Sequence, residues 1–276
     1  RSVDYNDTEK LNIEPSEFMT GGDITYMNNI SDNVNGYLTL SQSYKAGGFN
    51  LGIVPEGQRK FNQEKLINLE VGIKSTWDEG RIKFNASLFY NRRKDQQIRT
   101  SMQLYANDPS SFIFYTGSAA KGKSIGSEIE ARWIPNDRLE LYFNAGLLRA
   151  KIEQYSGPDT TLNDRSAAHA PAYTLSSGWE YRYPSGIFVM MSASATDEFY
   201  FDVNHNQKSK AFELMNARLG FEKDNWSIQL WGKNLTNKDF AVRGFYFGNE
   251  PPDFPNAIYT RRGDPRQVGL TFDMRF

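Results

Sequence analysis

The sequence contains no cysteine and only two histidines. Without cysteine, a disulfide framework and a thiolate metal site are both excluded. His169 and His205 fall in separate predicted loops, and neither has the neighbouring ligands that a metal site needs. We therefore expect both histidines to be surface residues, and we predict no metal site and no cofactor.

Long apolar runs and net charge are missing too. The longest apolar run, residues 187–191, is far shorter than the ~18 residues of a membrane helix, which excludes a helical membrane protein. The 32 basic residues are balanced by 33 acidic ones, so no basic surface for nucleic acid is expected. No signal peptide follows Arg1. We expect that an export signal was removed or that the chain is part of a longer polypeptide.

Aromatic residues, by contrast, are abundant, at 14% of a chain whose mean hydropathy is only −0.63. Disordered chains are poor in aromatics, so a folded structure is expected. Apolar residues alternate with polar ones or glycine along residues 67–74, 125–133, 173–182 and 215–222. At the C-terminus the apolar row is Val268, Leu270, Phe272, Met274 and Phe276. A period of two without a sustained helical period predicts an all-β fold.

The expected connections alternate between two lengths. Tight-turn residues occur near 31–34, 78–80, 135–137, 184–186 and 224–225, whereas long loops are expected near 6–20, 47–62, 101–111, 156–171, 202–210 and 244–265. In such a meander all the short turns lie at one end of the sheet and all the long loops at the other. This pattern predicts a transmembrane antiparallel up-and-down β-barrel with short periplasmic turns and long extracellular loops. About twelve strands fit, several longer than the ~9–11 residues that cross a bilayer.

Each strand would then present an apolar row to lipid and a polar row to a wet lumen. Aromatic residues beside the short turns would form a girdle at the periplasmic interface, namely Trp77, Trp133, Trp179, Tyr181, Tyr183 and Trp226. The alternative is a soluble sheet whose apolar row packs in a dry core. Packing of Val268, Leu270, Phe272 and Met274 against a second sheet would favour that alternative.

Four segments resemble motifs of TonB-dependent outer-membrane receptors. Residues 44–50 read YKAGGFN, residues 64–96 carry spaced Glu, Gly, Lys and LFY positions, residues 231–237 read WGKNLTN, and residues 264–276 resemble the family's closing strand. The resemblance implies a 22-stranded barrel around a plug, of which residues 1–276 would be the C-terminal part, with about 11–12 strands. The plug domain and the N-terminal barrel strands would be absent from this chain.

The resemblance also implies partners: the remaining strands and the plug, the TonB complex through the absent N-terminal region, the barrel-assembly machinery, the lipid bilayer and lipopolysaccharide. It implies that the last strand is the assembly signal, with Gly269, Leu270, Phe272 and Phe276 as its key residues. Aromatic and Arg side chains of the loops are candidates for contact with a small-molecule ligand, although packing between loops is the stronger interpretation. They are Tyr44, Tyr105, Tyr115, Arg243, Phe245, Tyr246, Phe247 and Phe254.

These features favour TonB-dependent active transport of a scarce nutrient, most simply a ferric siderophore, across the Gram-negative outer membrane. Cobalamin, haem or oligosaccharide uptake stays open, as does a non-transporting surface barrel (an adhesin or a phage or bacteriocin receptor) or a passive porin. Ser166 near His169 raises an esterase hypothesis, but no G-x-S-x-G elbow or third partner is visible. We therefore predict no catalytic residues and no enzymatic activity.

Overall fold

The computed structural model describes residues 5–6, 12–13, 16–105, 108, 111–155, 163–203 and 205–275. Its centre is one antiparallel sheet in which strands consecutive along the chain are neighbours, in the order β18-β15-β14-β13-β12-β10-β9-β8-β7-β4-β3, with β11 at the side of β10. The all-β up-and-down prediction is confirmed. The path strands are β3 (Gly22–Ser31), β4 (Val34–Lys45), β7 (Glu64–Trp77), β8 (Ile82–Gln103), β9 (Phe112–Asn136), β10 (Leu139–Tyr155), β12 (Tyr173–Arg182), β13 (Ile187–Thr196), β14 (Phe212–Lys223), β15 (Trp226–Lys233) and β18 (Gln267–Met274).

The remaining elements are short. They are strands β1 (Tyr5–Asn6), β2 (Asn12–Ile13), β5 (Gly48–Phe49), β6 (Lys60–Phe61) and β11 (Arg165–Ser166), the hairpin strands β16 (Ala241–Gly248) and β17 (Asn256–Arg262), and the 3₁₀ helices η1 (Glu56–Gln58) and η2 (Asp78–Gly80). In the described part of the chain, no helix is long and apolar enough to cross a membrane. Most of the loop expected near residues 6–20, and residues 156–162 of another, lie outside the described residues.

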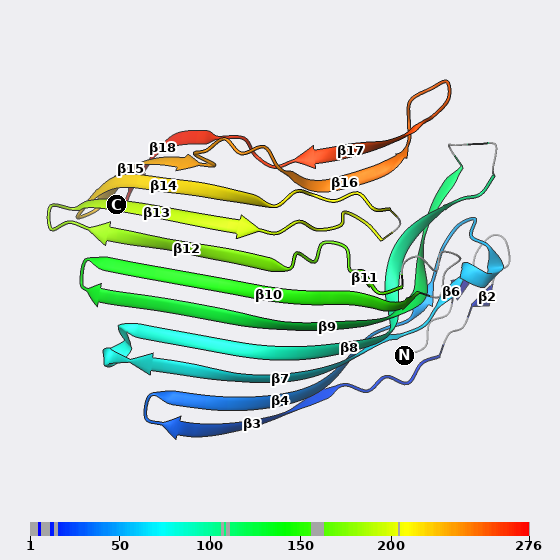
Figure 1. Cartoon of the computed structure of the whole chain (residues 1–276), viewed down its shortest axis with the longest axis horizontal. Helices are drawn as coiled ribbons and strands as arrows, with labels where there is room; N and C mark the ends of the chain where they lie inside the picture. Colours follow the sequence, from blue (N-terminus) through cyan, green and yellow to red (C-terminus); the bar gives the residue numbers. More distant parts are fainter. Residues whose placement is uncertain are drawn as a thin grey trace.

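All five predicted short turns join adjacent strands, and they lie together at one end of the sheet (left in Figure 1), while the long connections lie at the other. We call these the turn end and the loop end. The turn at η2 uses the left-handed backbone region at three successive residues, Asp78 (φ 51°), Glu79 (φ 52°) and Gly80 (φ 93°). Short polar side chains and glycine tolerate that region best, which is why this sequence turns here.

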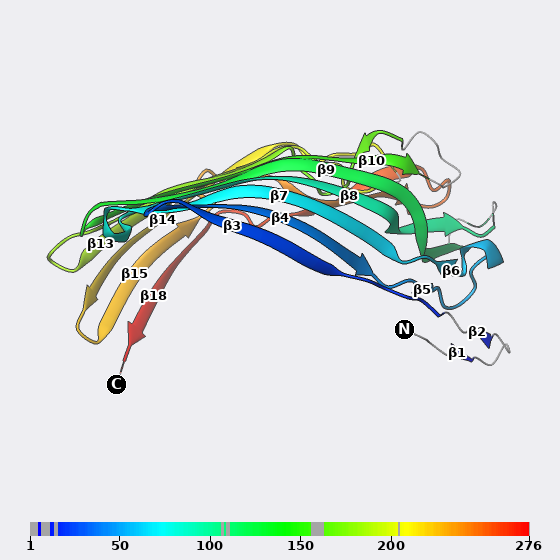
Figure 2. The same ribbon diagram turned by 90° about the horizontal axis from the view of Figure 1, so that it is seen from below.

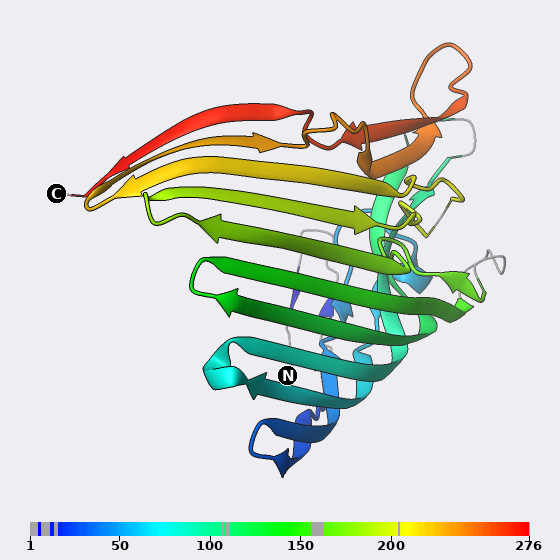
Figure 3. The same ribbon diagram turned by 60° about the vertical axis from the view of Figure 1, so that its left-hand side comes forward.

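The sheet is strongly curved, and its β15 and β18 strands bend away from the rest (Figures 2 and 3). Strands β3 and β18 form its two edges. The connection between β15 and β18 carries the antiparallel hairpin β16–β17, which extends beyond the loop end of the sheet (Figure 1). The sequence had indicated only a loop in this region.

One face of the sheet is apolar and exposed. Val268 (65% exposed), Leu270 (67%) and Phe272 (60%) stand on it, and the register continues this row through Leu230 and Leu219 on β15 and β14. Only four apolar side chains among the described residues are buried, and all four lie near the loop end: Val54, Ile98, Ile152 and Phe201. A soluble sandwich would bury the apolar row in a dry interior. This chain exposes it, as a barrel wall exposes its outer face to lipid.

The predicted aromatic girdle is on the same apolar face near the turn end. Trp133 is 51% exposed and Tyr183 49%. Trp226 contacts the rings of Phe221 and Phe272, with centroid separations of 5.4 and 6.2 Å. Rings with one apolar and one polar edge suit the boundary between lipid and water.

Candidate functional site

The opposite, polar face of the sheet carries ion pairs that cross from strand to strand. Arg132 on β9 donates two hydrogen bonds to Glu140 on β10, at 2.6 and 2.8 Å. Arg182 on β12 bridges Glu180 of its own strand at 2.5 Å and Glu222 of β14 at 2.9 Å. Charges on both sides of each strand pair are thereby neutralised locally, and the face is suited to contact with water or with a hydrophilic partner.

Neutral polar groups on this face are paired as well. Tyr37 on β4 donates a hydrogen bond of 2.7 Å to Glu70 on β7, and the Asn85 amide on β8 lies 3.3 Å from a Glu130 oxygen on β9. The polar face is therefore a connected hydrogen-bonding surface, consistent with the lumen side of a barrel wall.

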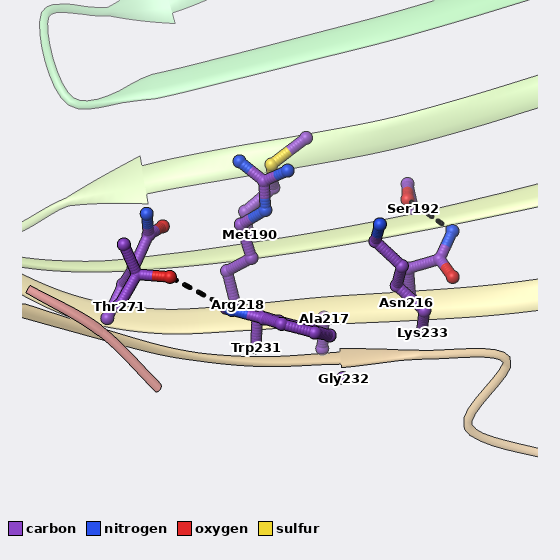
Figure 4. Close-up of a pocket in the computed structure, with 10 residues that line it drawn as sticks. Met190, Ser192, Asn216, Ala217, Arg218, Trp231, Gly232, Lys233 and Thr271 are labelled. Atoms are coloured by element: carbon purple, nitrogen blue, oxygen red, sulfur yellow. Dashed lines mark hydrogen bonds between the residues drawn. The ribbon is translucent and has the colours of Figure 1, made fainter. Parts of the chain in front are cut away.

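A cavity of about 300 Å³ opens on the polar face where β13, β14, β15 and β18 lie side by side (Figure 4). The Trp231 indole N–H donates to the Thr271 hydroxyl at 3.1 Å, which fixes the ring across the cavity. Lys233 lies 5.4 Å from the centre of that ring, and Arg218 lines the other side. Among the described residues neither cation has an ion-pair partner, so this cavity can accept an anionic group.

Aromatic rings cover glycines at regular positions on the same face. Every one of the five strand pairs joined by a long connection has such a pair in direct register, with the ring on the first strand and the glycine on the second: Tyr37–Gly72, Phe89–Gly126, Tyr142–Gly178, Phe188–Gly220 and Trp231–Gly269. A Cβ built on these glycines would lie 2.2–2.6 Å from the ring. Only glycine lets the ring lie flat on the neighbouring strand.

The hairpin β16–β17 brings several predicted ligand residues together at the loop end. Arg243, Phe245 and Phe247 point to one side of β16, with the Arg243 guanidinium 4.9 Å from the Phe245 ring centre. Tyr259 on β17 stands opposite Phe245 in the register, and its ring lies 5.2 Å from Phe247. Phe245 is 45% exposed and Phe247 38%. We call Arg243, Phe245, Phe247 and Tyr259 the hairpin face.

The other side of the hairpin packs on neighbouring loops. The Tyr246 ring lies 5.7 Å from that of His205, and Gly244 is buried directly against Phe201. Arg165 from the preceding connection donates hydrogen bonds to the backbone carbonyls of Asp202, Val203 and His205. Tyr246 thus contacts a neighbouring loop, while 38% of its surface stays exposed.

Burial lowers the pKa of His205 below its ordinary value; the negative charge of Asp202 opposes this shift in part, and the positive charge of Arg165 adds to it. The imidazole between the hairpin and its neighbouring loop is therefore held neutral at neutral pH. His169, the second histidine, lies 5.2 Å from the Phe199 ring.

The remaining predicted residues are dispersed. Tyr44 stands on the apolar face, in register with Lys65, rather than beside the hairpin. Tyr105 is 65% exposed in the β8–β9 connection, Tyr115 lies on the loop-end part of β9, and Phe254 lies at the hairpin tip. Of the assembly-signal residues, Leu270 and Phe272 lie on the apolar face, Gly269 lies under Trp231, and Phe276 lies outside the described residues.

No hydrolase site is assembled in the described part of the chain. Ser166 lies on β11 in register with Lys151, and no contact joins it to His169. No cluster of metal-ligating residues occurs there either. Sequence reasoning missed the cavity, whose residues come from four strands spread over about eighty positions, and only the strand register brings them together.

The sequence matches the family described as TonB dependent receptor-like, beta-barrel, over residues 2–235. Among solved structures, the ferric yersiniabactin uptake receptor FyuA from Yersinia pestis superposes with a TM-score of 0.79 at 18% identity, covering 96% of this chain and 38% of the receptor. The siderophore receptor PiuA from Acinetobacter baumannii gives a TM-score of 0.73 at 15% identity, covering 91% and 35%. A chain of the FpvAI–pyocin S2 complex gives 0.66 at 14%, covering 96% and 33%. The chain thus spans little more than a third of these structures.

Proposed function

Because this chain belongs to the TonB-dependent receptor-like β-barrel family, we propose that it is part of the barrel wall of a TonB-dependent transporter in the Gram-negative outer membrane. The observation that carries the proposal is the division of the sheet into an exposed apolar face and an ion-paired polar face. The loop end would face the exterior and the turn end the periplasm, as in other outer-membrane barrels.

In this proposal the two faces have separate tasks. Lipid covers the apolar row, while a plug domain and the remaining barrel strands, supplied outside residues 1–276, complete the lumen. The hairpin face would contact cargo at the mouth through exposed rings and Arg243. Displacement of the plug, driven through the TonB complex, would then admit the cargo. Arg218 and Lys233 in the polar-face cavity, which have no ion-pair partner in the described part of the chain, would receive an acidic group of the plug or of the passing cargo.

The cargo that the comparisons support best is a ferric siderophore, since FyuA and PiuA carry that assignment. Cobalamin, haem and oligosaccharides remain alternatives, because the residues that contact the ligand lie in loops that differ between such receptors. A deletion strain would be complemented with the intact receptor and tested for energy-dependent uptake of labelled ferric siderophores, cobalamin and haem. Uptake of one ferric siderophore that stops when TonB is removed supports the proposal, and uptake that persists without TonB contradicts it.

The second candidate function is that of a surface receptor for a bacteriocin, either in place of transport or in addition to it. The FpvAI–pyocin S2 complex favours this candidate, because a structure similar to this chain binds a bacteriocin there. Sensitivity of the complemented strain to a bacteriocin, with no uptake of any cargo, would support that role alone. A passive porin would instead show large stable conductance in planar bilayers.

A further inference from the structure

The hairpin β16–β17 leaves the sheet after β15 and returns to it before β18 (Figure 1). The last register pair of the sheet at this point is Lys233 with Gln267. We call residues 234–240, which lead out to the hairpin, and residues 263–266, which lead back from it, the foot of the hairpin. The foot contains the NLTN and DPR segments of two of the motifs that resemble the family.

Asn234 is buried in the foot, with only 4% of its surface exposed. Its side-chain amide donates two hydrogen bonds, to the backbone carbonyl of Lys238 at 2.9 Å and to that of Asp264 at 3.0 Å. Its side-chain oxygen accepts a hydrogen bond of 2.8 Å from the Lys238 backbone N–H. One side chain therefore uses both amide hydrogens and its oxygen to join the outgoing chain to the returning chain.

The same residue is attached to the sheet. The Asn234 backbone N–H donates to the side-chain oxygen of Asn216 on β14 at 3.0 Å, and the Leu235 N–H donates to the Met215 carbonyl at 2.8 Å. Asn234 adopts a left-handed backbone conformation (φ 47°), which asparagine tolerates better than most residues. The chain therefore turns out of the sheet at a point that is bonded to β14 and to both ends of the hairpin.

A second asparagine adds another link between the two ends. The Asn237 N–H donates to the Asn234 carbonyl at 2.8 Å, and the Asn237 side-chain oxygen accepts the Arg266 N–H at 3.0 Å. We call the side-chain hydrogen bonds of Asn234 and Asn237 the clasp. Because the clasp joins residues 29 and 30 positions apart in the sequence, it closes the whole hairpin onto one base.

Apolar packing supports the foot only in part. Phe240 stacks on Phe212 of β14 with the ring centres 4.5 Å apart, and its ring covers Gly263. A cavity of about 350 Å³ lies beside these contacts, lined by residues of the hairpin and by residues of β14 and β18. The two ion pairs of the foot join largely exposed side chains, and such pairs contribute little. The buried hydrogen bonds of the clasp therefore carry much of the connection between hairpin and sheet.

We propose that Asn234 and Asn237 are positioning residues, which through the clasp hold the hairpin face in its binding position before cargo arrives. The inference rests on the proposed function, in which the hairpin face contacts cargo at the mouth. A surface that is already in position loses little conformational entropy when a ligand binds, which increases the affinity. The hairpin is thus a fixed wall of the mouth and not a lid that closes over the cargo.

The test removes the side chain without straining the left-handed backbone, because glycine adopts that conformation freely. Each buried hydrogen bond contributes about fivefold to an equilibrium constant. Asn234→Gly should therefore leave the hairpin in its binding position in on the order of a tenth of the intact receptors, and the Kd of the labelled ferric siderophore that the strain takes up should rise about tenfold. The maximal uptake rate should stay within about twofold, since saturating cargo draws the hairpin back into position.

The position of the hairpin is measured by pulsed electron resonance between two spin labels. Residues 1–276 contain no cysteine, so Asp253→Cys in the hairpin connection and Lys65→Cys on β7 provide the labelling sites in this part of the receptor. The unmodified receptor should give a narrow distribution of distances, and Asn234→Gly a broad one. The matched control is Asp224→Gly, which changes another left-handed residue (φ 44°) at the opposite end of β15 and should behave as the unmodified receptor does.

A narrow distribution in Asn234→Gly, or a Kd equal to that of Asp224→Gly, overturns the inference. A loss confined to the maximal uptake rate also overturns it, because a positioning role acts on affinity. If Asn234→Gly does not fold, Asn237→Gly decides the question by the same measurements, with a smaller expected rise in Kd of about threefold. Failure of the unmodified receptor to take up any cargo would contradict the proposed function instead, while the label distances would still test the clasp.

Discussion

Replacing Gly220 by alanine tests whether the packing of aromatic rings on glycines stabilises the sheet. The new Cβ would lie 2.3 Å from Cζ and 2.4 Å from Cε1 of Phe188, well inside van der Waals contact. The Phe188 ring must then leave its place over β14, and the strain and lost ring contact together should lower the free energy of unfolding by about 1–3 kcal/mol. The measurement is the urea midpoint of the receptor folded into lipid vesicles, read from tryptophan fluorescence.

The chain supplies both a control and a rescue. Gly22 lies on β3 with nothing within 4 Å of its Cβ position, so Gly22→Ala should be neutral or stabilising by up to ~1 kcal/mol. The double variant Gly220→Ala/Phe188→Ala removes the clash and should lose less than the sum of the single variants. If Gly220→Ala is as harmless as Gly22→Ala, or if the double variant shows full additivity, ring-on-glycine packing does not stabilise the wall.

Three further predictions follow from the two faces and the loop end. Leu270→Arg should cost about 2–4 kcal/mol of unfolding free energy because it places a charge on the apolar face, whereas Asp273→Arg on the polar face should cost much less, as measured in vesicles. Because burial lowers the pKa of His205 from its ordinary value of 6.5, the neutral imidazole stabilises the fold above that pH and the stabilisation is lost as the pH falls below it, so the hairpin should become protease-sensitive near pH 5, and His205→Gln should abolish this pH dependence. Arg243→Ala/Phe245→Ala should weaken cargo binding about tenfold or more in a titration with the transported ligand while leaving folding unchanged; unaltered affinity would remove the hairpin face from the binding mouth.

The arrangement of strands and turns was predictable from the sequence because each short turn carries its own local chemistry. The sheet order then follows, since consecutive strands pair as neighbours. Residues 36–43 do not alternate cleanly between apolar and polar side chains, because Tyr37 occupies the polar face over Gly72 while Leu38 and Leu40 occupy the apolar face. Aromatic rings on the polar face interrupt the alternation of apolar and polar residues. Which face each residue occupies is therefore determined only by the pairing with the neighbouring strands.

The loop end was less predictable. The run from Arg243 to Phe247 alternates as a strand does, yet its length and position within a long connection favoured a loop over a hairpin. The face that a residue occupies is also hard to predict here, because β-bulges between β8 and β9 shift the alternation near residues 93–97. The cavity depends on pairings between strands that no local pattern specifies.

The length of β9 determines how far its hairpin with β8 extends beyond the neighbouring strands. From Lys123 this strand continues for eleven more residues to Phe112, and this part of β9 turns away from the direction of the sheet together with its partner β8 (Figures 1 and 2). The hairpin of β8 and β9 is therefore directed across the loop end of the sheet instead of straight beyond it.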